Sequence, residues 1–89
     1  MDKQAIHAEI CERLTATYAV KNHDYGDSFA QLRARHPGAI LVRLYDKYLR
    51  LETLLSGEDP YVKDESIDDT LLDLANYAIM ELVERKTEE

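Results

Sequence analysis

The sequence predicts an all-α fold, a small bundle of three main helices that forms one domain over residues 1–89. Valine, isoleucine and aromatic residues never settle into the two-residue period of a strand, so a sheet is improbable. Apolar residues recur every three or four positions along three long stretches, as they do on one face of a helix. The chain contains no repeat, no low-complexity tract and no linker long enough to separate domains.

The first helix is expected over residues 3–19, where four apolar or aromatic side chains share one face: Ile6, Ile10, Leu14 and Tyr18. Residues 20–38 form either a connection or a short extra helix near 28–35. His36-Pro37-Gly38 closes this region, because proline does not continue a helix simply.

The second helix is expected over residues 39–55, and Ser56-Gly57 ends it. Its apolar residues cover a wide arc, and its polar stripe is narrow: Arg43, Asp46, Lys47 and Arg50. An arc that wide needs more than one neighbouring helix. A domain of this size buries only about 60 to 65% of the surface that its unfolded chain would expose. We therefore expect a homo-oligomer, in the first instance a dimer.

The third helix is expected from about residue 64 to 85, with its core face at Ile67, Leu71, Leu74, Ala75, Ala78, Ile79 and Leu82. At about 100° per residue, Asp68 falls inside this face. Four polar residues cluster along its border: Glu65, Asp69, Asp73 and Asn76. Packing like charges this closely is costly at neutral pH unless a cation, protons or facing arginines compensate, and carboxylates are the ligands that Mg²⁺ prefers. Alternatively, acids in the first turn simply favour the positive end of the helix dipole.

The charge balance bears on location and partners. The net charge of −7 argues against binding a nucleic-acid polymer, which needs a basic surface. Basic residues dominate 33–50, whereas acids dominate 58–73, so one segment suits phosphate and the other a cation. The single cysteine forms no internal disulfide, and no apolar run approaches the ~20 residues of a membrane span. We expect a cytoplasmic protein that contacts no membrane.

Three stretches, in order, carry a family resemblance: KNHDYGDSF (21–29), RLYDKYLRLETLL (43–55) and VKDESIDDTLLDLANYAIM (62–80). Together they resemble the nucleotide modification associated domain family, type 1, of bacteria and their phages, over about residues 5–83. That family is similar to the MazG-like all-α nucleoside triphosphate pyrophosphohydrolases. There, an ExxE motif on one helix and an ExxD motif on the next hold Mg²⁺, and water cleaves between the α- and β-phosphates.

The resemblance implies a set of metal and catalytic residues. Glu65 and Asp68 match the ExxD motif, which implies roles in catalysis and in metal binding. The ExxE motif keeps one acid of two, and either Asp46 or Glu52 stands in for it. Asp46 lies in the motif that resembles this particular family and is preferred. The implied Mg²⁺ ligands are thus Asp46, Glu65, Asp68 and Asp69.

The enzyme interpretation also predicts substrate-binding residues. The predicted phosphate contacts are Lys21, Lys47 and Arg50. The predicted contacts to the base, the sugar and the rest of the nucleotide are Asn22, Asp24, Tyr25, Asp73 and Asn76. Lys21-Asn22 is equally an ordinary signal for the end of a helix, and Gly26 an ordinary turn residue.

The resulting hypothesis is a nucleotide-binding protein that acts as a Mg²⁺-dependent pyrophosphohydrolase on ordinary or modified (d)NTPs. Two alternatives stay open. One is a protein that binds or sequesters nucleotides without turnover, which the missing glutamate would suit. The other is a small acidic interaction module, such as a phage inhibitor that presents residues 58–73 to a host protein.

Overall fold

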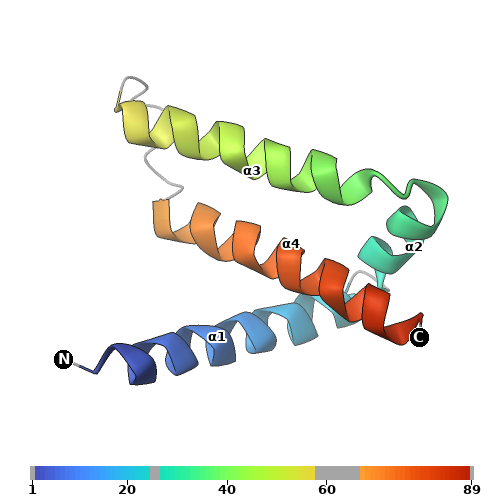
Figure 1. Cartoon of the computed structure of the whole chain (residues 1–89), viewed down its shortest axis with the longest axis horizontal. Helices are drawn as coiled ribbons and strands as arrows, with labels where there is room; N and C mark the ends of the chain where they lie inside the picture. Colours follow the sequence, from blue (N-terminus) through green and yellow to red (C-terminus); the bar gives the residue numbers. More distant parts are fainter. Residues whose placement is uncertain (1, 25–26, 58–66, 89) are drawn as a thin grey trace.

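The computed structural model describes residues 2–24, 27–57 and 67–88, and these residues form four α-helices and no strand (Figure 1). The helices are α1 (Lys3–Asp24), α2 (Ser28–Arg35), α3 (Ala39–Ser56) and α4 (Ile67–Thr87). The all-α class is confirmed. The prediction of three helices is corrected to four, because the region that the sequence left open between a connection and a helix is the helix α2.

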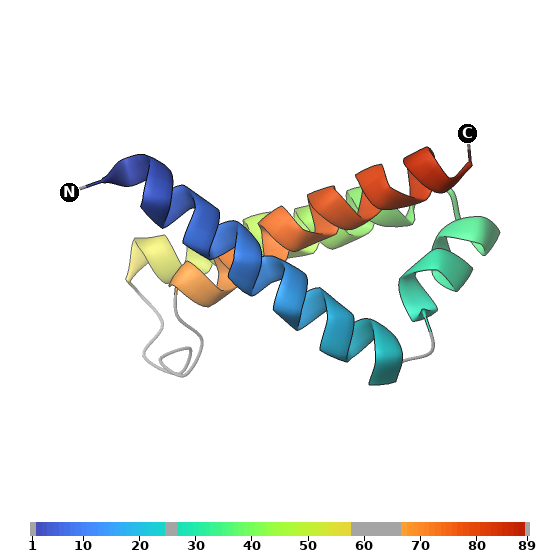
Figure 2. The same ribbon diagram turned by 90° about the horizontal axis from the view of Figure 1, so that it is seen from below.

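α3 and α4 lie side by side and make the most extensive contact between helices (Figure 1). α1 crosses α4 obliquely, and α2 stands at the end of the molecule where the C-terminus of α4 lies (Figure 2). α4 therefore contacts α3 on one side and α1 on another. None of the helices in the described part of the chain is both long and apolar enough to cross a membrane.

α1 ends at Asp24 and not at Ala19, which corrects the predicted boundary. No glycine or proline precedes Gly26, and the basic residues Lys21 and His23 in the last turn favour the negative end of the helix dipole. After α1 the chain turns at Asp27, whose backbone is left-handed (φ 58°) and whose N–H donates to the Asn22 carbonyl over 3.1 Å. Lys21 and Asn22 consequently project from a helix and not from a loop.

The ends of α3 and α4 agree closely with the pattern of the sequence. α3 stops at Ser56 because Gly57 adopts a left-handed conformation (φ 67°), which costs a glycine little. α4 runs to Thr87, two residues past the predicted end, and is described from Ile67. The predicted first residues of this helix, 64–66, lie outside the described residues.

α2 is held against α4 by one ion-pair cluster and one aromatic contact. The Arg33 guanidinium donates to both carboxylate oxygens of Glu81, over 2.9 and 3.0 Å, and also bonds Glu88. Arg85 donates to the same Glu81 carboxylate over 2.9 Å. The Phe29 ring packs 6.1 Å from that of Tyr77, centroid to centroid, and is only 7% exposed. An eight-residue helix is thereby fixed at one position on α4.

The inward face of α4 differs from the predicted one. Asp68 is exposed, so the expectation that it points inward is wrong, and so is the assignment of Leu71 and Leu82 to the core, because these are 47% and 59% exposed. Thr70 is fully buried instead, and Tyr77 is half-buried. The neighbouring helices partly cover Asp73 and Asn76 of the polar border and leave much of the apolar arc of α4 uncovered.

The ion-pair cluster generates a prediction about acid stability. Hydrogen bonds from Arg33 and then Arg85 hold the pKa of Glu81 below its ordinary value of 4.5, against an opposing effect of burial. Because the pKa is lowered by folding, ionised Glu81 stabilises the fold above pH 4.5, and this contribution is lost as pH falls below 4.5 towards the lowered pKa. Glu81→Gln should therefore lower the urea midpoint at pH 7 and do so much less at pH 3.

Circular dichroism at equal protein concentration measures both midpoints. Glu9→Gln, an exposed glutamate on α1, is the matched control and should change neither. An equal loss at pH 7 and pH 3 for Glu81→Gln would show that packing, and not the charge, anchors α2.

Candidate functional site

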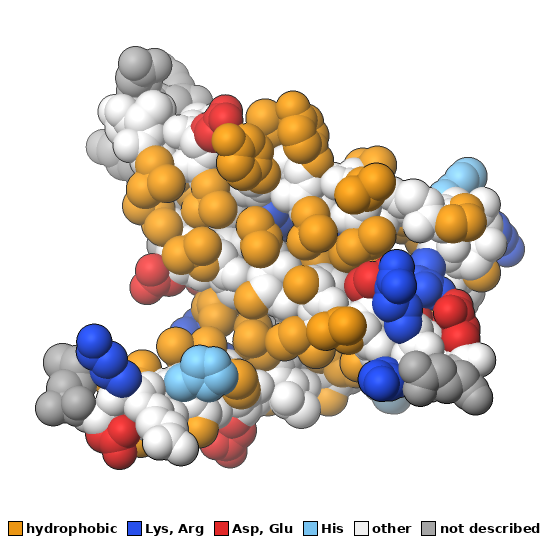
Figure 3. All heavy atoms as spheres, viewed as in Figure 1, with side chains coloured by type: hydrophobic (Ala, Val, Ile, Leu, Met, Phe, Trp, Pro, Cys, Tyr) orange, Lys and Arg blue, Asp and Glu red, His pale blue; other side chains and the backbone are white. Residues whose placement is uncertain are grey.

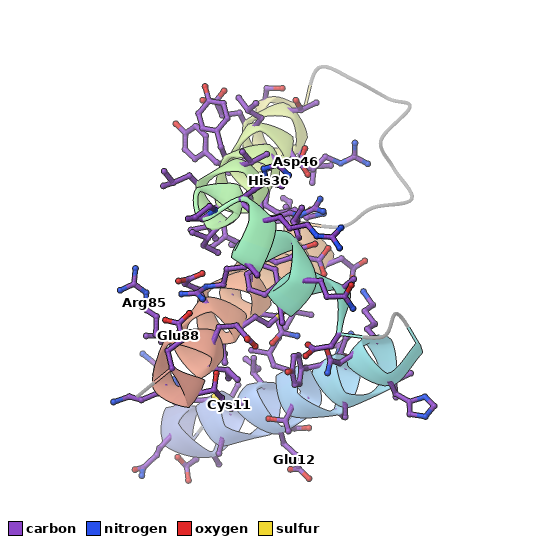
Figure 4. The ribbon with its side chains drawn as sticks, turned by 90° about the vertical axis from the view of Figure 1, so that its right-hand side faces the viewer. Cys11, Glu12, His36, Asp46, Arg85 and Glu88 are labelled. Atoms are coloured by element: carbon purple, nitrogen blue, oxygen red, sulfur yellow. The ribbon has the colours of Figure 1, made fainter. Side chains whose placement is uncertain are left out.

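A cavity of about 550 Å³ lies between the C-terminal half of α1, α2, the first turns of α3 and the middle of α4. Side chains from these helices converge on this part of the molecule (Figure 4). Its volume is in the range of about 300 to 1,000 Å³ that small-molecule sites occupy. The lining residues are Thr17, Tyr18, Lys21, Asn22, Ser28, Phe29, Gln31, Leu32, Arg35, His36, Arg43, Asp73, Asn76, Tyr77 and Met80.

The charge of the lining is opposite to that of the chain. Lys21, Arg35 and Arg43 contribute cations, and Asp73 is the one acid among the lining residues. The Asp73 carboxylate forms an ion pair with Lys47 over 3.2 Å, so its charge is already balanced from α3. A chain with a net charge of −7 thus carries a positively charged cavity, which suits an anionic ligand.

Aromatic rings make up much of the apolar part of the lining. Phe29 from α2 and Tyr77 from α4 pack at a tilt of 45°, and the Arg43 guanidinium lies 5.9 Å from the centre of the Tyr77 ring. The pKa of Tyr18 is raised by burial first and then by the negative charges of Asp27 and Glu84, so its hydroxyl stays protonated near neutral pH. A ligand in the cavity meets flat rings on the same lining that holds the cations.

A smaller groove of about 270 Å³ between α1 and α4 shares several residues with the cavity. Lys21, Asp73 and Asn76 line both the groove and the cavity, whereas Asp69 lines the groove but not the cavity. The Asn76 side-chain amide donates to the Leu14 carbonyl over 3.2 Å, so one hydrogen bond ties α1 to α4 beside the groove. Asp69, Asp73 and Asn76, which the sequence placed on the polar border of α4, therefore line the groove beside α1.

The structure divides the predicted substrate-binding residues into two groups. Lys21, Asn22, Asp73 and Asn76 line the cavity. Lys47 and Arg50 line a separate recess of about 360 Å³ on α3, together with Asp46. Asp24 is the last residue of α1. Tyr25 lies outside the described residues.

The predicted metal ligands do not converge within the described part of the chain. Asp46 belongs to the α3 recess, at the end of the molecule opposite α1 (Figure 4). Asp69 belongs to the groove and Asp68 is exposed, whereas Glu65 lies outside the described residues. Over residues 2–24, 27–57 and 67–88, no three histidine, cysteine or acidic side chains form a group that could hold a metal ion. The described carboxylates alone do not fit Mg²⁺, and a site that includes Glu65 stays a prediction.

Glu52, the alternative to Asp46, is engaged elsewhere. Its carboxylate accepts a hydrogen bond from the Tyr48 hydroxyl, which is the main reason that the pKa of Tyr48 is raised. Both side chains are exposed on α3. Glu52 does not line the cavity, the groove or the recess.

The cavity residues that sequence reasoning missed include Phe29, Arg35, His36, Arg43 and Tyr77. The excess of basic residues over 33–50 was a partial signal, since Arg35 and Arg43 belong to it. The spacing of apolar residues in the sequence does not show in which direction the short helix α2 folds back. That direction brings Phe29 and Arg35 to the same cavity as Lys21.

The match to a family model shows to which protein family this chain belongs. The family described as nucleotide modification associated domain 1 matches residues 21–84, which is most of the chain. The chain belongs to this family. All the cavity-lining residues of this nucleotide modification associated domain except Thr17 and Tyr18 lie in the matched range. No curated protein and no solved structure shows a significant match, and the similarity to MazG-like pyrophosphohydrolases stays a prediction.

The link between α1 and α4 generates a second prediction. Asn76→Ala removes the donor to the Leu14 carbonyl and should lower the free energy of unfolding by about 0.5 to 1.5 kcal/mol. Urea denaturation followed by circular dichroism measures this. Thr53→Ala is the control, because the Thr53 hydroxyl bonds only the Leu49 carbonyl of its own helix. Equal effects of the two substitutions would mean that the Asn76 bond does not fasten α1.

Proposed function

We propose that this chain binds a nucleotide in the cavity between α1, α2 and α4. Its phosphates would contact Lys21, Arg35 and Arg43, and its base would lie against Phe29 and Tyr77. The observation that carries the proposal is the reversal of charge: a strongly acidic chain lines its cavity with cations. The family description, which associates the domain with nucleotide modification, supports the same ligand class.

The cations suit phosphate in complementary ways. An arginine guanidinium is a planar fork that can donate two hydrogen bonds to one phosphate, whereas a lysine ammonium is a compact point charge. Lys21 comes from α1, Arg35 from α2 and Arg43 from α3, so a phosphate chain between them would be held from three helices. Lys47 is left out of this set because its ammonium is paired with Asp73.

The rings suit the other half of a nucleotide. A nucleobase has a flat face that stacks on aromatic side chains, at about 1 to 3 kcal/mol per base. Phe29 and Tyr77 lie in contact with each other on the cavity lining, and the amides of Asn22, Gln31 and Asn76 offer donors and acceptors for the base edge and sugar. The cavity thus combines the anionic, aromatic and polar contacts that a nucleotide requires.

A matched pair of lysine substitutions on one helix tests phosphate binding. Both lysines are exposed, but Lys21 lines the cavity, whereas Lys3 lies at the start of α1 and does not. Lys21→Gln should weaken nucleotide binding about tenfold or more, because it removes a charged hydrogen bond. Lys3→Gln should leave the affinity unchanged.

Titration calorimetry measures the nucleotide affinities of both variants. The ligands are the four ordinary dNTPs and a 5-hydroxymethylated dCTP, in the absence of Mg²⁺. Affinity should fall with added salt in the wild type and fall less steeply in Lys21→Gln. Equal affinities of the two variants, or heat with none of the five nucleotides, would refute nucleotide binding in the cavity and favour the acidic interaction module.

Mg²⁺-dependent release of pyrophosphate from a (d)NTP is a second candidate function. It is supported by the resemblance to MazG-like enzymes and by the position of Asp69, whose groove shares Lys21 and Asn76 with the cavity. When bound, Mg²⁺ would neutralise phosphate charge and lower the pKa of a water molecule. Among the candidate ligands, Asp69 lines this groove, and Asp68 and Glu65 precede it in the sequence.

Pyrophosphate release in the presence of Mg²⁺ separates the enzyme from a binding protein. If the chain is an enzyme, Glu65→Gln and Asp69→Asn should abolish release and leave the affinity measured without Mg²⁺ nearly unchanged. Glu12→Gln is the control, since Glu12 points away from the other helices (Figure 4). Binding of dNTPs with no release in the wild type would assign the chain to nucleotide binding or sequestration.

A further inference from the structure

We infer that the apolar face of α3 and α4 is the interface of a homodimer. This face consists of exposed apolar side chains of both helices: Leu41, Val42, Tyr45, Tyr48, Leu49, Leu55, Ile67, Leu71, Ile79 and Leu82. Hydrophobic side chains form a broad patch over both helices in the space-filling view (Figure 3). Leu41 and Tyr45 are 72% and 62% exposed, values unusual for residues of an apolar helix face.

The chain exposes more area than a folded monomer of its mass should. The whole chain, with the residues outside the described part, exposes 7053 Å². A folded monomer of 10.3 kDa should expose about 5,400 Å², so the excess is about 1,700 Å². A standard protein interface buries about 800 Å² on each partner, and obligate dimers bury more. The excess is thus large enough to include one interface on this face.

The interior of a single chain is too small to stand alone. Among the described residues only Leu14, Phe29, Ala39 and Thr70 are buried. For 89 residues this is a small buried core, and oligomerisation is one way in which chains with a small core gain stability. The apolar face of α3 and α4 must be covered whenever the chain is folded. A second copy of the chain is the partner that is always present at the chain's own concentration.

The geometry of the face suits self-association. A two-fold interface pairs the same surface of each copy, so an apolar stripe along one side of a helix meets its own counterpart. Along this stripe of α3 the charged side chain is Glu52, and the Tyr48 hydroxyl donates to its carboxylate. The exposed Asp68 lies within the corresponding arc of α4, so this face carries two acidic side chains among its apolar ones. The stacked rings of Tyr45 and Tyr48 supply the aromatic anchors typical of interface centres.

The interface leaves the cavity open. At about 100° per residue, Arg43 and Lys47 lie on the opposite side of α3 from the centre of this stripe. Arg43 lines the cavity, and Lys47 reaches Asp73 on α4. The dimer is consequently independent of the proposed nucleotide site, and neither proposal depends on the other.

Sedimentation and denaturation of the purified chain test the dimer. The wild type should sediment at twice the 10.3 kDa of one chain, and its urea midpoint should rise when the protein concentration is raised about a hundredfold, by mass action. Tyr45→Glu and Leu41→Glu should give the mass of one chain or lose helicity. Val20→Glu, at an equally exposed apolar residue of α1 outside the face, should leave the mass and the midpoint unchanged.

Three outcomes would overturn the inference. One is a wild-type protein that has the mass of one chain and a urea midpoint that does not depend on protein concentration. In that case the apolar face of α3 and α4 would be available to a different protein. A second is a mass other than that of two copies. The third is a Tyr45→Glu variant that dimerises as tightly as the wild type, since this would place the interface elsewhere.

Discussion

The attachment of α2 to α4 is the constraint on which the rest of the structure depends. A helix of eight residues is too short to form by its own propensity, so its position comes from tertiary contacts. The forked bond from Arg33 to Glu81 and the packing of Phe29 on Tyr77 provide them. This attachment closes the cavity and brings side chains of α2 opposite the last turns of α1. Without it, the cations and the rings would not share one space.

α4 works as a two-sided helix. Its polar border, with Asp73 and Asn76, faces the cavity and the groove beside α1. Its apolar arc, with Leu71 and Leu82, is exposed next to the apolar stripe of α3. The first side gives its polar residues a place on the cavity and the groove, whereas the second leaves apolar residues with little cover within one chain. The ligand binding and self-association that we propose thus use different sides of one element.

The sequence predicted the elements well and their mutual arrangement only in part. The second predicted helix and the short helix near 28–35 follow from apolar spacing and from His36-Pro37-Gly38, which are local signals. Lys21 and Asn22 were singled out, but as loop residues, because Lys-Asn resembles a helix end when nothing shows that the helix continues. Asp68 was wrongly placed inward because the apolar arc of α4 was equated with the core. Periodicity finds an apolar side correctly but does not say what covers it.

The residues of the candidate site were likewise predicted only in part from the sequence. The basic excess over 33–50 led to a prediction of phosphate contacts at Lys47 and Arg50, whereas the cations of this segment that line the cavity are Arg35 and Arg43. All four lie in one segment, and only the packing of α2 and α3 against α4 separates them. The family description associates the chain with nucleotide modification, and Glu65, on which the proposed hydrolysis depends, lies outside the described part.

The most direct measurement of the central claim is a nuclear magnetic resonance experiment on the chain with ¹³C-labelled aromatic rings and saturating dNTP. We predict nuclear Overhauser contacts from base or ribose protons to the rings of Phe29 and Tyr77, with ³¹P resonances of the nucleotide shifted on binding. Contacts that instead reach only Tyr45 and Tyr48 on the exposed stripe of α3, or no contacts to any ring, would contradict the account.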